Sequence, residues 1–202
     1  MRMSRNRLWV LAVAASAALV ALGWPGCAKP TLREPQPAPQ LVIYDKTWSY
    51  QGNPGQEIRT PHYVLYTTHS DAAFLEQLPR FMETAFQNYS ALIKPTARPS
   101  APMQVYLFGQ RDQWEHFTDQ HTGPSAAIYR KIQEGGYVHD GRAIFYDIQR
   151  LKTFAVTGHE CFHQYLSHYA AHRPPAWLDV AMPGFPVGFT YTWPSGEAMS
   201  VR

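Results

Sequence analysis

The sequence is poor in cysteine, which limits how the fold can be stabilised. Only Cys27 and Cys161 are present among 202 residues. If Cys27 is lipidated or removed with a leader, no disulfide can form within one mature chain, so a disulfide-stabilised scaffold is excluded. The chain is 45% hydrophobic and 14% aromatic. That composition excludes a disordered protein and is sufficient for the core of one domain.

The chain after its first 26 residues has no excess of positive charge. The first 26 residues carry three of the 18 basic side chains and none of the 15 acidic ones, so the remainder carries 15 of each. No basic stripe with interleaved aromatic residues is visible. We therefore expect no nucleic-acid partner.

The first 26 residues have the pattern of a secretory signal. Arg2, Arg5 and Arg7 precede an uncharged apolar run over residues 8–22, and small or turn-forming residues follow. This order of a basic, an apolar and a cleavage region predicts a signal peptide over residues 1–26. The alternative is an uncut membrane anchor, for which the run is short. We expect a secreted or cell-envelope protein on the periplasmic side.

Cys27 resembles the modified cysteine of a bacterial lipoprotein, because Gly26 precedes it. Trp24 and Pro25 depart from that signal, so ordinary cleavage stays open. Residues 27–40 are rich in proline and predict an extended linker. We expect contact with the membrane only through a lipid anchor at Cys27 or through an uncut signal. Residues 41–202 would then form the domain.

The domain is expected to be α+β, with a small, mostly antiparallel sheet packed with an active-site helix. Alternating apolar and polar residues predict strands, and apolar residues at three- and four-residue spacing predict helices. Asp140 and Gly141 predict a tight hairpin turn. Ser70 and Asp71 offer an N-cap, and Pro79 predicts a kink or two helices. The predicted strands cover residues 61–69, 103–108, 137–139 and 143–146, and the predicted helices cover residues 71–93, 110–121 and 150–172.

The last predicted helix carries the sequence "HECFH", residues 159–163. Residues four apart lie one turn apart on the same helix face, so His159 and His163 can bind one tetrahedral zinc ion. Glu160 lies one step round the helix, where it can take a proton from a metal-activated water. The alternative is a pair of solvated or core histidines. Cys161 points away from the metal face and is expected to be a small core residue.

"HECFHQYL", followed by "PPAWL", resembles the bacterial members of the peptidase MA-like metallopeptidases of the gluzincin type. Those proteins typically read His-Glu-x-x-His-Gln and then Pro-x-Trp-Leu-x-Glu-Gly. The resemblance covers residues 63–178 and implies the N-terminal half of a gluzincin catalytic domain, a zinc cofactor and a peptide or protein substrate. It also places Gly136 and Tyr137 near the substrate, although a plain hairpin without a ligand is the alternative.

The chain departs from the family pattern after Leu178. The third zinc ligand of the family is a glutamate, and Val180 stands at its position. Asp179 or Glu197 could substitute as the ligand. Prolines and glycines in residues 180–189 replace a helix of the family, so we expect a domain that is incomplete at its C-terminus.

Two functions therefore remain open. The first is an envelope-associated zinc-dependent metallopeptidase that hydrolyses peptide bonds with a metal-activated water. The alternative is a catalytically inactive relative that binds a peptide or an envelope partner, or a truncated gene product.

Overall fold

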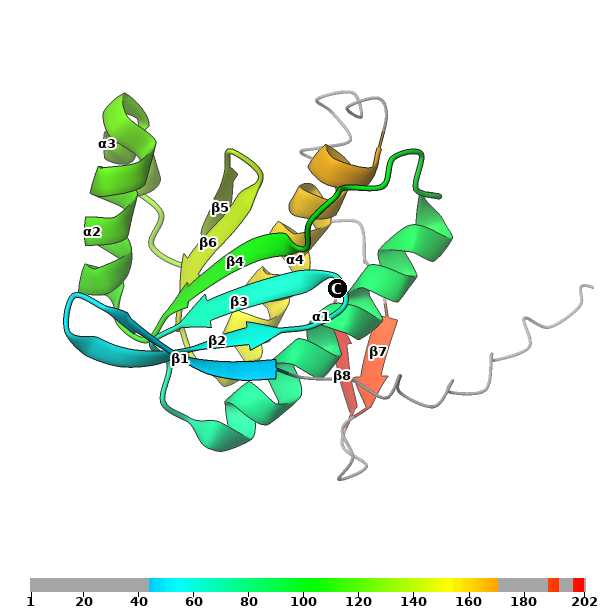
Figure 1. The fold of residues 1–202 in the computed structure, drawn as a ribbon, viewed down its shortest axis with the longest axis horizontal. Coiled ribbons are helices and arrows are strands. Elements are labelled where there is room, and N and C mark those ends of the chain that lie inside the picture. The colour runs from blue at the N-terminus through cyan, green and yellow to red at the C-terminus, as the bar shows by residue number, and fades with distance from the viewer. Residues whose placement is uncertain (1–43, 171–188, 193–197, 202) are drawn as a thin grey trace, which may run out of the picture. The chain divides into compact units, whose positions relative to one another are not determined.

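The computed structural model describes residues 44–170, 189–192 and 198–201 (Figure 1). The predicted signal peptide, the proline-rich linker and the Trp177–Leu178 part of the family motif lie outside these residues. Residues 189–192 and 198–201 form an antiparallel pair of strands, β7 (Phe189–Thr192) and β8 (Ala198–Val201). The described chain before them forms one sheet with helices.

The sheet has six strands in the order β1-β2-β3-β4-β6-β5. Its two central pairings, β3 with β4 and β4 with β6, are parallel, and the three others are antiparallel. The strands are β1 (Tyr44–Tyr50), β2 (Asn53–Arg59), β3 (Tyr63–Thr67), β4 (Met103–Phe108), β5 (Gly136–His139) and β6 (Arg142–Tyr146).

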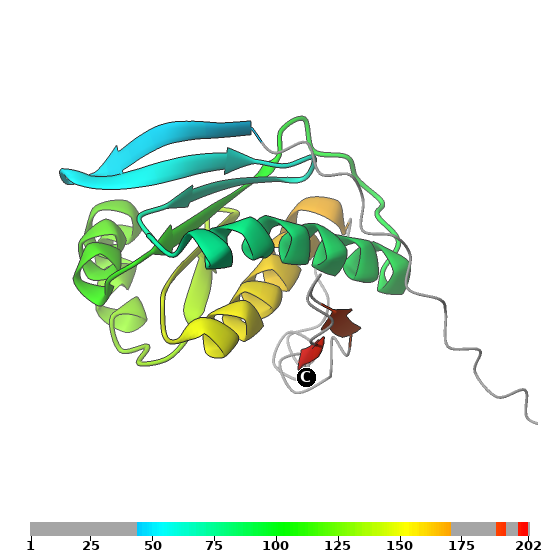
Figure 2. The same ribbon diagram turned by 90° about the horizontal axis from the view of Figure 1, so that it is seen from below.

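Helix α1 connects β3 to β4, α2 and α3 connect β4 to β5, and α4 follows β6. Helices α1 and α4 lie side by side against one face of the sheet (Figure 1, Figure 2). The helical segments are α1 (Ala72–Leu92), α2 (Arg111–Thr122), a short 3-10 turn (Gly123–Ser125), α3 (Ala126–Tyr129) and α4 (Arg150–Tyr169).

Strand β4 is buried on both faces of the sheet. Val105 and Leu107 pack in the core formed with α1 and α4. Tyr106 and Phe108 belong to a second, aromatic cluster. This cluster also contains Trp114 of α2. Because successive side chains of a strand point to opposite faces, the two cores lie on opposite sides of the sheet.

The α+β class is confirmed and three of the five strand pairings are antiparallel, but the two parallel pairings in the centre were not predicted. Helix α1 connects β3 to β4 across the sheet, so the two strands run in the same direction. Such a crossover needs a long connection, which the helix provides. The result is a mixed sheet with a parallel centre and antiparallel edges.

The β1–β2 hairpin was not predicted from the sequence. Its turn is formed by Gln51 and Gly52, both with positive φ angles, of 51° and 77°. Pro54 lies before the part of β2 that pairs with β3, so it interrupts no hydrogen bond on that side. The sequence did not reveal this hairpin, because its turn is not the Asn-Gly or Asp-Gly that gives the strongest local signal.

Helix α1 begins where the sequence predicts. The carboxylate of Asp71 accepts the N–H groups of Ala73 at 2.9 Å and Phe74 at 3.1 Å, which caps the helix. The chain then continues as one helix through Pro79, so the alternative of two helices is wrong. Pro79 is buried with one apolar face of α1, and this burial compensates for the backbone hydrogen bond that proline removes.

The β5–β6 hairpin and α4 lie where the sequence predicts them. Asp140 and Gly141 form the turn with positive φ angles of 47° and 72°. Helix α4 carries the "HECFH" motif in its second half. Among the described helices, none is both long and apolar enough to cross a membrane.

Candidate functional site

The two predicted metal ligands face each other on α4. The Nε2 atoms of His159 and His163 are 3.1 Å apart, and both side chains are half-buried. Two nitrogen ligands at 2.0–2.1 Å from one zinc ion, at a tetrahedral angle, are separated by about 3.3 Å. The separation of the two imidazole nitrogens therefore fits a shared zinc ion.

Glu160, the residue after His159, is buried, with 6% of its surface exposed. Burial raises the pKa of its carboxyl group to about 8, because a charge is poorly solvated there. The backbone N–H of Gly136 acts in the opposite direction and stabilises the carboxylate. A pKa in the neutral range suits a group that exchanges protons with a substrate or a water.

Gly136, at the start of β5, contacts Glu160 through its backbone N–H. A Cβ atom built on Gly136 would lie 3.0 Å from Cγ of Glu160 and 2.8 Å from Cβ of Phe145. Real Cβ atoms do not come as close as 2.8 Å to another carbon, and 3.0 Å is unusually tight, so a side chain at residue 136 would displace Glu160 or the strand. The structure thus brings Gly136, predicted from the family resemblance, into the site.

Tyr137, its predicted neighbour in substrate binding, has its side chain on the opposite face of the hairpin. Its ring stacks on Tyr129 with centroids 3.9 Å apart, and its hydroxyl group lies 2.8 Å from Oγ1 of Thr118. Burial raises the pKa of this phenol well above its ordinary value. The side chain of Tyr137 therefore packs in the aromatic cluster on the α2 side of the sheet and not beside Glu160.

Cys161 is confirmed as a core residue. It lies on the face of α4 that packs in the core, with 0% of its surface exposed. Burial, followed by the nearby carboxylates of Glu160 and Glu83, raises the pKa of its thiol well above the ordinary value. A protonated, inaccessible thiol serves neither as a nucleophile nor as a metal ligand.

A third zinc ligand is not found near the pair within residues 44–170. No group of three histidine, cysteine, aspartate or glutamate side chains in the described parts of the chain could hold a metal ion. The alternative ligands Asp179 and Glu197, like Val180, lie outside the described residues. The described part of the chain thus contains two of the predicted zinc ligands, His159 and His163.

Two residues that fix α4 in place were not singled out in the sequence. The hydroxyl group of Tyr89, on α1, donates to the carbonyl oxygen of Gly158, directly before His159. The carboxamide of Gln164 donates to the carbonyl oxygens of Gln104 and Gly141, each at 2.7 Å. Gln164 could have been found from its spacing, because it lies four residues after Glu160 and shares its helix face.

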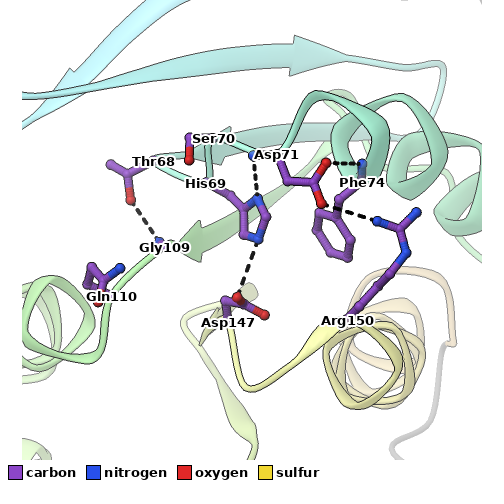
Figure 3. Close-up of a pocket in the computed structure, with 9 residues that line it drawn as sticks. All are labelled: Thr68, His69, Ser70, Asp71, Phe74, Gly109, Gln110, Asp147 and Arg150. Atoms are coloured by element: carbon purple, nitrogen blue, oxygen red, sulfur yellow. Dashed lines mark hydrogen bonds and ion pairs between the residues drawn. The ribbon is translucent and has the colours of Figure 1, made fainter.

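A separate pocket of about 370 Å³ lies at the carboxyl ends of β3, β4 and β6, near the start of α4 (Figure 3). It does not include the histidine pair, which is more than two turns further along α4. Its lining residues are Thr68, His69, Ser70, Asp71, Phe74, Gly109, Gln110, Asp147 and Arg150.

The polar and charged side chains of this pocket interact with one another, as Figure 3 shows. Nδ1 of His69 accepts the N–H of Asp71 at 3.2 Å, so the ring proton is on Nε2, which lies 3.4 Å from Asp147. Arg150 lies 3.3 Å from Asp71 and donates to Gln77. These pairs join the starts of α1 and α4. The polar residues of the pocket therefore hold the start of the helix that carries the motif.

Comparison of the chain with family models, curated proteins and solved structures gave no match. The family resemblance therefore depends on the motif residues and their order along the chain.

Proposed function

We propose that the protein is an envelope-associated, zinc-dependent metallopeptidase. The observation that carries this proposal is the 3.1 Å separation of the Nε2 atoms of His159 and His163, with the buried residue Glu160 directly after His159. The spacing fits two nitrogen ligands of one zinc ion, and the carboxyl group lies one residue from the first ligand. The envelope location is supported by the signal-like residues 1–26 alone.

Each residue of the site has a distinct part in the proposed reaction. His159 and His163 would hold the zinc ion, together with a ligand from outside the described residues. When bound, zinc polarises a carbonyl group and acidifies a water. Glu160 would accept a proton from that water and deliver it to the leaving amine. The N–H of Gly136 orients the Glu160 carboxylate.

The proposed substrate is a peptide in extended conformation. Strand β5 is at the edge of the six-stranded sheet and pairs with β6 on its other side. Among the described residues no strand pairs with its other edge, where a further strand can add to the backbone groups apart from the Gly136 N–H, which donates to Glu160. Because Gly136 begins this strand and contacts Glu160, a peptide added there would pass beside the proposed catalytic carboxylate.

The test is a measurement of zinc content and peptide hydrolysis on the purified full chain. We expect about one equivalent of bound zinc and cleavage of a mixed peptide library. Glu160→Gln should retain the zinc and lose hydrolysis, whereas Glu115→Gln, at an exposed ion pair on α2, should retain both. A wild-type protein that binds no zinc under metal-replete conditions would contradict the proposal.

A second candidate is a non-catalytic relative that binds a peptide at the same edge strand. It is favoured by the two-ligand site of the described residues and by Val180 at the position of the family's third ligand. This candidate predicts peptide binding without turnover. Hydrolysis that depends on Glu160 would exclude it.

A further inference from the structure

Gln164 follows the second histidine of the motif and is completely buried. Its Nε2 group donates at 2.7 Å to the carbonyl oxygen of Gln104 on β4 and at 2.7 Å to that of Gly141 in the β5–β6 turn. These two carbonyl groups belong to different segments of the chain. A single side chain of α4 therefore fixes the helix against both a central strand and the hairpin.

The motif contains two interleaved pairs with four-residue spacing. His159 and His163 form the pair that faces the proposed metal. Glu160 and Gln164 form a second pair, rotated by one residue, which faces the hairpin. Glu160 contacts Gly136 at the beginning of β5, and Gln164 binds Gly141 just after the end of β5. The helix is thus attached to both ends of this strand.

The contact at Gly136 leaves little room for movement. A Cβ atom there would lie 3.0 Å from Cγ of Glu160 and 3.0 Å from the carbonyl oxygen of Ile144, so the main chain of β5 is packed directly on the Glu160 side chain. A small shift of the hairpin would change both this contact and the direction of the Gly136 N–H. The position of the Glu160 carboxylate consequently depends on the position of the hairpin.

We propose that Gln164 is a positioning residue for the Glu160 carboxylate and acts through the β5–β6 hairpin. Its two hydrogen bonds fix the hairpin, and the hairpin fixes the orientation of Glu160. This inference rests on the proposed function for its catalytic consequence. The placement of Glu160 itself is a structural relationship that can be measured without turnover.

The kinetic test uses Gln164→Met, which keeps the length of the side chain and removes both donors. We expect kcat to fall about 100-fold, as for a displaced catalytic group, while KM and zinc binding are retained. Tyr165→Phe is the matched control, because it removes a buried hydrogen bond from the next residue of α4 to the carbonyl of Ile93, away from the hairpin. Equal kcat values for folded Gln164→Met and Tyr165→Phe would overturn the inference.

A second measurement is independent of activity and metal. In the wild type, Glu160→Gln should shift the amide resonance of Gly136 in a ¹H–¹⁵N NMR spectrum, because the two groups are in contact. In the Gln164→Met background the same change should no longer shift that resonance. A retained response would overturn the positioning role, even if the wild type proves to have no peptidase activity.

A further variant covers the case in which Gln164→Met does not fold. Gly136→Ala alters the other end of the attachment and changes none of the groups that form the two hydrogen bonds of Gln164. It should reproduce the loss of kcat with zinc still bound. Full activity of folded Gly136→Ala would show that Glu160 is not oriented by the hairpin and would overturn the inference.

Discussion

The Nε2 atoms of His159 and His163 face each other across 3.1 Å on adjacent turns of α4. Two arrangements have this geometry. In one, both nitrogens are deprotonated and bind the same cation. In the other, one neutral imidazole donates its N–H to the other. Only the first arrangement requires a metal. A measurement of zinc binding by this pair therefore distinguishes the two arrangements.

Substitution of either histidine should therefore remove zinc. Loss of a residue that only supports a metal ligand lowers affinity by up to about 100-fold. We expect His159→Ala and His163→Ala, which remove a ligand itself, to lower zinc affinity by more than that. His168→Ala is the control, because His168 lies on the same helix and donates to the carbonyl of Gly141 instead. Calorimetric titration with zinc measures all three. Unchanged affinity in the two ligand variants would leave the imidazole–imidazole hydrogen bond as the explanation of the geometry.

The hydroxyl group of Tyr89 should support the same pair from α1. It is buried and donates to the carbonyl of Gly158, so Tyr89→Phe should lower the free energy of unfolding by about 1 kcal/mol. It should also lower zinc affinity, by up to about tenfold, because the main chain before His159 loses its support. Tyr165→Phe loses a comparable bond to Ile93.

Denaturant unfolding and zinc titration of both tyrosine variants give the comparison. A similar loss of stability in the two variants with a loss of zinc affinity only in Tyr89→Phe is expected. Equal zinc affinities would show that Tyr89 contributes to stability alone.

The elements that the sequence predicted well are those with strong local signals. The Asp140–Gly141 turn, the alternation in β4 and the proline-free apolar spacing of α4 each act over a few residues. The parallel pairing of β3 with β4 has no local signal, because it depends on how α1 crosses the sheet. For the same reason the sheet was expected to be mostly antiparallel.

The site shows the same division between local and long-range information. His159, Glu160 and His163 follow from helical spacing, since all three are on one helix. The contact between Glu160 and Gly136 joins residues on two elements, and the bonds of Gln164 join three segments. Spacing along α4 can suggest that Gln164 faces the same side as Glu160, but it cannot name Gly141 as the partner.

The carboxylate of Glu83 should make stability depend on pH in the acid range. It lies on α1 and accepts hydrogen bonds from Oγ1 of Thr60 at 2.6 Å, from the main-chain N–H of His62 at 2.9 Å and from Nδ1 of His62 at 2.7 Å. Burial alone would raise its pKa, but the hydrogen bonds outweigh burial and lower the pKa below the ordinary 4.5. The ionised form is therefore the one that stabilises the fold.

The sign of the pH effect follows from this lowered pKa. The unfolded chain binds the proton more readily, so the contribution of Glu83 is complete above pH 4.5 and is lost as the pH falls through the lower pKa of the folded state. Glu83→Gln should be less stable at neutral pH by about 2 kcal/mol and should lose part of the acid dependence. Glu76→Gln, on the exposed side of α1, should match the wild type. Parallel stability curves for Glu83→Gln and the wild type between pH 2 and 6 would contradict this assignment.

Asp147 should determine how firmly α4 begins. Gln149, the residue before the helix, has a φ of 87° and makes no side-chain cap. In its place, Oδ1 of Asp147 accepts the N–H of Gln149 at 3.1 Å and the hydroxyl group of Thr153 at 2.8 Å. Asp147→Ala removes both bonds, so the free energy of unfolding should fall by about 1 to 2 kcal/mol, as for loss of an N-cap.

The same substitution should increase amide hydrogen exchange in the first turn of α4, while exchange in the turn that carries His159 and His163 rises less. Asp119→Ala is the control, because Asp119 forms an exposed ion pair with Arg130 on the α2 side of the sheet, and such pairs contribute about 0 to 1 kcal/mol. Because the residues around Asp147 join the starts of α1 and α4, its effect should be larger than that of Asp119 although both are aspartates. Equal stability losses in the two variants would show that α4 is held at its start by packing and not by the hydrogen bonds of Asp147.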